Sequence, residues 1–219
     1  MKRLFAIAVL LSCFVFEAAA QKRLKPVSET NHRAYRSALD KKLWKNMPED
    51  VPFSFEIRPS FTPESALYYD SQKGLFIYVK ANRNIWYTGH IYNGTVSKSG
   101  SMRVKARKYS CPVPPDKASH FCELFQVAIE TAEDQDIRGL DGIIYQLWTN
   151  GRTKTAECWS PRQEGSNCDR LVKLLVALSE YTQEKDSEGI ESLIPEADSL
   201  ADSFRKITLE VRNRNNPYI

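Results

Sequence analysis

The sequence lacks the short motifs that mark the better-known catalytic and nucleotide-binding sites. It contains no Gly-x-Ser-x-Gly nucleophile elbow, no Gly-x-Gly-x-x-Gly segment, no phosphate-binding loop and no His-Glu-x-x-His zinc motif. No catalytic residue and no cofactor are therefore predicted. A hydrolase is not excluded, because an acid–base pair assembled from residues distant in the sequence leaves no motif.

Residues that bind transition metals are scarce and badly spaced. The chain has three histidines, His32, His90 and His120, and no two of them stand four residues apart, the spacing that places two ligands on one helix face. The cysteines lack the Cys-x₂₋₄-Cys spacing typical of zinc sites. No metal site is predicted.

No segment is apolar for long enough to cross a membrane. The longest apolar run, Leu4–Phe16, has 13 residues, whereas a membrane-spanning helix needs ~20. Lys2 and Arg3 precede this run, and Ala18 and Ala20 follow it at the positions of a cleavage site. The pattern predicts a signal peptide over residues 1–20 and a secreted or periplasmic protein with no transmembrane segment in its mature chain.

Cys13 leaves a second localisation open. The segment Leu10–Cys13 resembles a lipobox, in which cleavage before the cysteine is followed by lipid attachment. Cleavage after Ala20 would release the protein with Gln21 at its N-terminus, whereas lipidation of Cys13 would anchor it to the cell envelope. The formal charge of the chain is +4 and falls to +3 without residues 1–20, so no nucleic-acid partner is expected.

Composition and periodicity predict one globular α+β domain over residues 21–219. Hydrophobic residues make up 42% of the chain and aromatic residues 11%, which suits a folded domain. We expect an N-terminal helix over 28–46, a sheet-and-helix core over 52–183 and a C-terminal helix over 187–212. Within the core, apolar and polar residues alternate over 53–58, which predicts a half-buried strand.

Three turn sequences predict that the sheet is mainly antiparallel and built from hairpins. The turns are Asp70–Gly74, Asn93–Gly94 and Asn150–Gly151, and each is flanked by strand-forming residues, which extend back to Ile85 before the second turn. Helices opening at Pro114 and after Ser166 should pack against this sheet. The expected fold class is an antiparallel sheet packed against helices, with N- and C-terminal helical additions.

Four cysteines follow the leader, and an even number in an exported chain predicts disulfides. Cys111, Cys122, Cys158 and Cys168 allow three pairings, which spacing alone does not distinguish. We expect the local pairs Cys111–Cys122 and Cys158–Cys168. Each would join the start of a helix to the preceding segment and contribute about 2–3 kcal/mol.

Two surface features suggest binding. Arg103, Lys105 and Arg107 alternate with smaller residues, so a strand there would present a ridge of cations that could bind an anion. Alternatively, the charges protect an edge strand from aggregation. A set of aromatic residues could form part of a sugar- or peptide-binding face: Tyr68, Tyr78, Trp86, Tyr87, Tyr92 and Trp148.

The leading functional hypothesis is an exported, disulfide-stapled binding protein of the periplasm or cell envelope. Its partner would be an envelope protein, an anionic polymer or a glycan. The alternative is a small secreted hydrolase whose site is assembled across the sheet.

Overall fold

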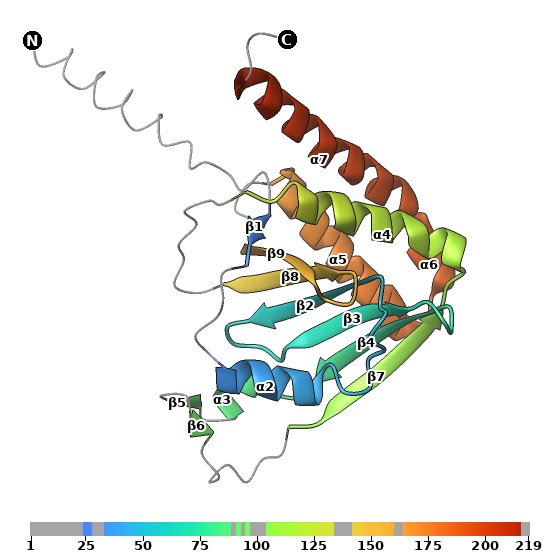
Figure 1. Cartoon of the computed structure of the whole chain (residues 1–219). Coiled ribbons are helices and arrows are strands. Elements are labelled where there is room, and N and C mark those ends of the chain that lie inside the picture. Colours follow the sequence, from blue (N-terminus) through green and yellow to red (C-terminus); the bar gives the residue numbers. More distant parts are fainter. Residues whose placement is uncertain are drawn as a thin grey trace, which may run out of the picture.

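A seven-stranded antiparallel sheet with helices on both faces forms the body of the protein (Figure 1). The computed structural model describes residues 24–27, 33–88, 91–92, 95–96, 104–133, 142–159 and 164–215. The α+β prediction is confirmed. The expected leader, including Cys13, lies outside the described residues.

The order of strands in the main sheet is β1-β9-β8-β2-β3-β4-β7, and every neighbouring pair is antiparallel. A separate pair of two-residue strands forms a second sheet. The strands are β1 (Lys25–Pro26), β2 (Phe53–Pro59), β3 (Ser65–Asp70), β4 (Leu75–Ala81), β5 (Ile91–Tyr92), β6 (Thr95–Val96), β7 (Ala106–Pro112), β8 (Ile143–Thr149) and β9 (Lys154–Trp159).

Two of the predicted hairpins have the expected geometry. Gly74 has φ +64°, and Asn150 and Gly151 have φ of 52° and 61°, the left-handed values that favour Gly and Asn. A Cβ at Gly151 would lie 2.5 Å from the carbonyl oxygen of Glu49, so the turn also needs a residue without a side chain. These turns confirm the β3–β4 and β8–β9 hairpins.

The prediction for the middle hairpin is partly wrong. The strands β5 and β6 pair as expected, but Ile85–Thr88 forms a short helix, α3, instead of a strand. The cause is capping of the helix start: Asn84 Oδ1 accepts a hydrogen bond from Tyr87 N at 2.9 Å, and the carboxylate of the distant Glu64 accepts one from Ile85 N at 2.6 Å. These bonds satisfy the first free N–H groups of α3.

Helices α4 (Pro115–Glu130) and α5 (Asn167–Glu184) cover one face of the sheet (Figure 1). Helix α7 (Ile194–Asn215) packs against both of them, and the short α6 (Ser187–Ser192) lies beside α5 and α7. Their apolar residues and the inward side chains of β2, β3, β4 and β8 form the larger core. Both predicted helix starts are found: Pro115 begins α4, and Ser166 Oγ caps α5 by accepting from Asp169 N at 3.2 Å. No described helix is both long and apolar enough to span a membrane.

The opposite face is covered by α2 (Arg33–Lys42) and α3, which together with the sheet enclose a second, smaller core. Residues 28–32 of the expected N-terminal helix lie outside the described residues, and α2 ends at Lys42, four residues before the expected end at 46. The small core contains Leu39, Leu43, Trp44, Tyr68, Ile77, Val79 and Trp148.

The described cysteines differ from the prediction because all four are free thiols. Neither the Cys111–Cys122 nor the Cys158–Cys168 disulfide is formed. Cys111, Cys158 and Cys168 are buried and pack in the larger core as small apolar side chains, and Cys122 is partly buried against it. The Cys158 thiol interacts with Cys168, and this hydrogen bond, together with burial, raises the pKa of Cys158.

The predicted cation ridge lies at an edge of the sheet. Arg103 is outside the described residues, and β7 begins only at Ala106. Just before it, Asn82 N donates to Lys105 O at 2.9 Å, and Lys105 N donates to the side-chain Oδ1 of Asn82 at 2.8 Å. Lys105 and Arg107 are exposed, and β7 is an edge strand, as the alternative interpretation expects.

Candidate ligand-binding cavity

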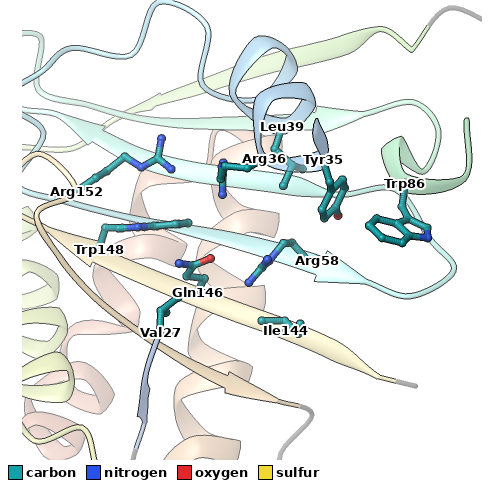
Figure 2. Close-up of a pocket in the computed structure, with 10 residues that line it drawn as sticks. All are labelled: Val27, Tyr35, Arg36, Leu39, Arg58, Trp86, Ile144, Gln146, Trp148 and Arg152. Atoms are coloured by element: carbon teal, nitrogen blue, oxygen red, sulfur yellow. The ribbon is translucent and has the colours of Figure 1, made fainter. Parts of the chain in front are cut away.

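A cavity of about 310 Å³ lies between α2 and the sheet, within the size range of small-molecule sites (Figure 2). Its floor is formed by β2 and β8, its roof by α2, and its ends by α3 and the β8–β9 turn. Val27, just after β1, lines one side. The other lining residues are Tyr35, Arg36, Leu39, Arg58, Trp86, Ile144, Gln146, Trp148 and Arg152.

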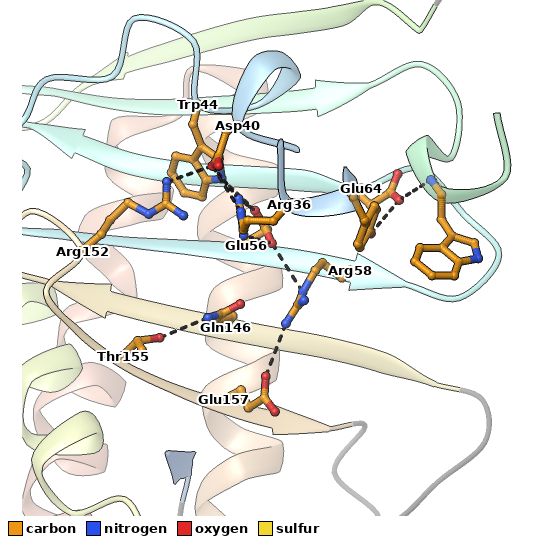
Figure 3. Close-up of polar contacts among 12 residues, drawn as sticks. Arg36, Asp40, Trp44, Glu56, Arg58, Glu64, Gln146, Arg152, Thr155 and Glu157 are labelled. Carbon is orange, nitrogen blue, oxygen red and sulfur yellow. Dashed lines mark hydrogen bonds and ion pairs between the residues drawn. The ribbon is translucent and has the colours of Figure 1, made fainter. Parts of the chain in front are cut away.

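A fully buried carboxylate, that of Glu56 on β2, stands at the centre of the polar contacts beside this cavity (Figure 3). Arg36 of α2 binds both of its oxygens, with Nη1–Oε1 at 3.1 Å and Nη2–Oε2 at 2.8 Å. The indole of Trp44 donates a third hydrogen bond, at 2.7 Å. Bidentate and charge-assisted bonds of this kind are among the strongest that a buried carboxylate can receive.

The alternation of β2 explains how this carboxylate comes to be buried. Phe53 and Phe55 point into the larger core, so Ser54, Glu56 and Arg58 point to the opposite face. The sequence predicted that this polar row faces solvent, and that prediction is wrong for Ser54 and Glu56, which are buried. The correction arises because α2 lies over the row and supplies Arg36 as a counter-ion.

Arg58 lines the floor of the cavity, and its side chain is only 10% exposed. One of its terminal nitrogens donates to Glu157 of β9 at 3.3 Å. Its Nε lies 3.4 Å from Glu56 Oε1 but has no hydrogen-bond acceptor among the described residues. A guanidinium has five N–H donors, and among the described residues Arg58 uses one of them in a hydrogen bond, to Glu157.

Arg152 has the same property at the other end of the cavity. It follows the Asn150–Gly151 turn with φ 72° and lies over the rings of Trp44 and Trp148, 4.8 and 4.6 Å from their centroids. It donates to Asp40 at 3.2 Å, and its buried Nε has no acceptor in the described part of the chain. Burial, followed by the charge of Arg36, lowers the pKa of Arg152, which still leaves it charged at neutral pH.

The charges around the cavity balance. Three arginines, Arg36, Arg58 and Arg152, face three carboxylates, Asp40, Glu56 and Glu157, through the ion pairs of Figure 3. Lys25 lies beside Glu157, and Glu64 stands at the aromatic end, so the described groups number four cations and four carboxylates. Glu157 is bound more weakly than Glu56. Its hydrogen bond to Arg58 is long, at 3.3 Å, whereas Glu56 also accepts hydrogen bonds from Arg36 and Trp44. Burial raises the pKa of Glu157 above its ordinary value, although Arg58 and Lys25 act in the opposite direction.

The remaining end of the cavity is aromatic. Trp86 of α3 and Tyr35 of α2 meet edge to face, with centroids 5.0 Å apart. The buried Glu64 fixes both, because it accepts hydrogen bonds from Tyr35 Oη at 2.8 Å and from Trp86 N at 3.2 Å. The cavity therefore combines guanidinium groups along its floor with an apolar end wall.

The residues singled out in the sequence are scattered over the molecule. Trp86 and Trp148 of the aromatic set line the cavity, whereas Tyr78 lies in the larger core and Tyr87 is exposed against Phe61. The side chain of Tyr92 is outside the described part. The cation ridge lies on the far edge strand, and the cysteines lie in or against the larger core.

The polar residues of the cavity were missed by sequence reasoning. Arg36, Arg58, Arg152, Glu56 and Glu157 come from four segments, and each is unremarkable in its own segment. The helical stripe of Tyr35, Leu39 and Leu43 was the one usable signal, because an amphipathic helix must cover some face of the sheet.

The histidines give no catalytic constellation in the described residues. His32 and His90 lie outside them, and His120 on α4 forms a hydrogen bond at 2.8 Å with Asp198 on α7. This pair lines a second hollow of about 250 Å³ with Glu123, Asp202 and Arg205, whose charges pair with one another. The part of the chain that the structure describes has no group of three or more His, Cys, Asp or Glu side chains that could hold a metal ion.

Comparisons with protein-family profiles, with curated proteins and with solved structures find no match to this chain.

Proposed function

We propose that this chain is a binding protein and that its ligand occupies the cavity between α2 and the sheet. The ligand would be a small molecule with one anionic group and an apolar or aromatic body. The observation that carries the proposal is the pair of largely buried arginines, Arg58 and Arg152, which line the cavity with donors that no described residue uses. Unpaired donors in such a place are costly unless a ligand or water meets them.

The lining supports this choice of ligand. Guanidinium groups favour carboxylate and phosphate oxygens, which they bind with two parallel hydrogen bonds. Tyr35, Trp86 and Ile144 would surround the apolar part. Hydrolysis gains less support, because the glutamates beside the cavity do not stand free as an acid–base pair. Glu56 and Glu157 are paired with arginines, and Glu64 is bound by Tyr35 and the start of α3.

We also propose that the protein is exported, with cleavage after Ala20 as the first expectation and lipidation at Cys13 as the alternative. Support comes from the charged start and the apolar run of residues 2–16.

Calorimetric titration with 4-phenylbutyrate and its neutral amide tests the binding proposal. The carboxylate should bind at least tenfold more tightly than the amide, because only the carboxylate can use the free donors of Arg58 and Arg152. Arg58→Met and Arg152→Met should each weaken the carboxylate complex at least tenfold and leave the amide unaffected.

Arg107→Met is the matched control, since it removes the same charged group from the exposed edge strand β7. It should leave the affinity unchanged. If it alone removed binding, the cation ridge and not the cavity would be the anion site. Equal affinities for the carboxylate and the amide, or no binding of 4-phenylbutyrate and of phenyl phosphate, would contradict the proposed function.

A further inference from the structure

Arg58 stands between two carboxylates that are held very differently. Glu56 on one side is fully buried and already receives hydrogen bonds from Arg36 and Trp44. Glu157 on the other side is 25% exposed, and its only hydrogen bond to Arg58 is 3.3 Å long. An incoming anion would meet less resistance in displacing Glu157 than in displacing Glu56.

The balance of charges around the cavity indicates that a proton is taken up when an anion binds. With four cations and four carboxylates among the described groups around the cavity, Lys25 and Glu64 included, an added monoanion would leave the cluster with one excess negative charge. An uncompensated charge in a largely buried place is expensive. Neutrality returns if one carboxylate takes up a proton, and the most exposed one in contact with Arg58 is Glu157.

We infer that the anionic group of the ligand replaces Glu157 on Arg58, and that Glu157 takes up one proton from solvent as the ligand binds. In the free protein, the carboxylate of Glu157 thus accepts the hydrogen bond from Arg58 that the ligand's anionic group accepts in the complex. The inference rests on the proposed function, because it concerns the same cavity and the same class of ligand. The total charge of the site is unchanged by the exchange: one anion enters and one carboxylate becomes a neutral carboxylic acid.

The surroundings of Glu157 allow this exchange. Its cross-strand neighbour on β8 is the neutral Gln146, and its cross-strand neighbour on β1 is Lys25. Arg58 of β2 is its ion-pair partner, and the buried Cys158 follows it on the opposite face of β9. Burial already favours the protonated form of Glu157, while Arg58 opposes it. A ligand anion on Arg58 would weaken the attraction between Arg58 and Glu157 and would add a negative charge nearby. Both effects favour the protonated form of Glu157.

Linkage makes the exchange measurable. If one proton is taken up on binding, affinity rises as pH falls, by up to about tenfold per pH unit above the pKa of Glu157. The titration uses the purified chain and 4-phenylbutyrate, which stays ionised from about pH 5.5 to pH 8, in cationic buffers at constant ionic strength. Wild type, Glu157→Gln, Arg58→Met and Arg107→Met are compared.

Wild type should bind more tightly at the acidic end of this range. Glu157→Gln should bind several-fold more tightly than wild type at about pH 8 and lose the pH dependence, because the competing charge is gone. Arg107→Met should follow wild type throughout. Thermal unfolding of each variant verifies that it is folded, and Glu157→Asp, which keeps the carboxylate, should retain a pH dependence.

The outcomes separate the two proposals. If wild type binds the carboxylate through Arg58 with the same affinity at every pH, or if Glu157→Gln leaves the affinity unchanged, the exchange is wrong and the proposed function stands. If wild type binds neither 4-phenylbutyrate nor phenyl phosphate, the proposed function fails and this inference fails with it.

Discussion

Arg36 and Glu56 form a bidentate ion pair that joins α2 to the centre of the sheet, with N–O distances of 3.1 and 2.8 Å. The pair is one of the contacts that join α2 to β2 across the cavity, together with the small apolar core. Because Glu56 is fully buried, its free energy in the folded state depends on this partner and on Trp44.

Arg36→Met should therefore destabilise the protein by about 3–5 kcal/mol, since it leaves a buried carboxylate without its main counter-ion. Urea denaturation at neutral pH measures this change. The exposed pair Arg205–Glu123 provides the control, and Arg205→Met should cost less than about 1 kcal/mol. Equal losses in the two variants would show that the Arg36–Glu56 pair has no special structural role.

Tyr35→Phe tests the end wall of the cavity. It removes the hydrogen bond from Tyr35 to the buried Glu64, which also holds the first N–H groups of α3. We expect a loss of about 1–3 kcal/mol in the free energy of unfolding, because a buried carboxylate loses a donor. A Tyr87→Phe variant, whose hydroxyl is on an exposed ring, should be neutral by the same measurement.

Individual secondary-structure elements show how much of the fold could be predicted from the sequence. The β3–β4 and β8–β9 hairpins were predictable because Gly74, Asn150 and Gly151 satisfy a local backbone requirement, φ > 0. Helix α3 was not predictable, because one of its capping residues, Glu64, lies twenty-one positions before Ile85. Secondary structure that depends on such a contact cannot be read from the segment itself.

The cavity could not be predicted from the sequence for the same reason, because it too depends on contacts between distant segments. Glu56 and Arg58 have the alternation of a solvent-facing row, and only the placement of α2 converts that row into a buried network. Arg152 lines the cavity because of the turn that precedes it. The expected disulfides depended on the number of cysteines, which does not report how far apart the sulfur atoms lie.

Alkylation should distinguish the cysteines. The four described cysteines are free thiols; Cys122 is partly exposed, whereas Cys111, Cys158 and Cys168 are buried. Iodoacetamide should therefore modify Cys122 first in the native protein and all four after unfolding, because burial keeps a thiol inert. Intact-mass measurement before and after unfolding gives both results. Modification of the three buried thiols as fast as Cys122 in the native protein would contradict their placement in the core.

Asp70 should contribute to stability above its unfolded pKa. Burial alone would raise the pKa of Asp70, but hydrogen bonds from the side chain and backbone of Lys73 outweigh it and lower the pKa below 3.8. A group whose pKa is lowered by folding loses its contribution as pH falls through the folded value. Asp70→Asn should thus lower stability at neutral pH and flatten its decline below about pH 4, as followed by urea denaturation. An acid decline identical to that of wild type would show that other carboxylates cause it.

A crystal structure of the protein with 4-(4-bromophenyl)butyrate tests the central claim most directly, because the bromine atom is located by its anomalous scattering. The account predicts the carboxylate on Arg58, Glu157 turned away from that guanidinium, and the bromine beside Trp86 and Tyr35. A bromine position outside the cavity, for instance against Lys105 and Arg107 of the edge strand, would contradict it.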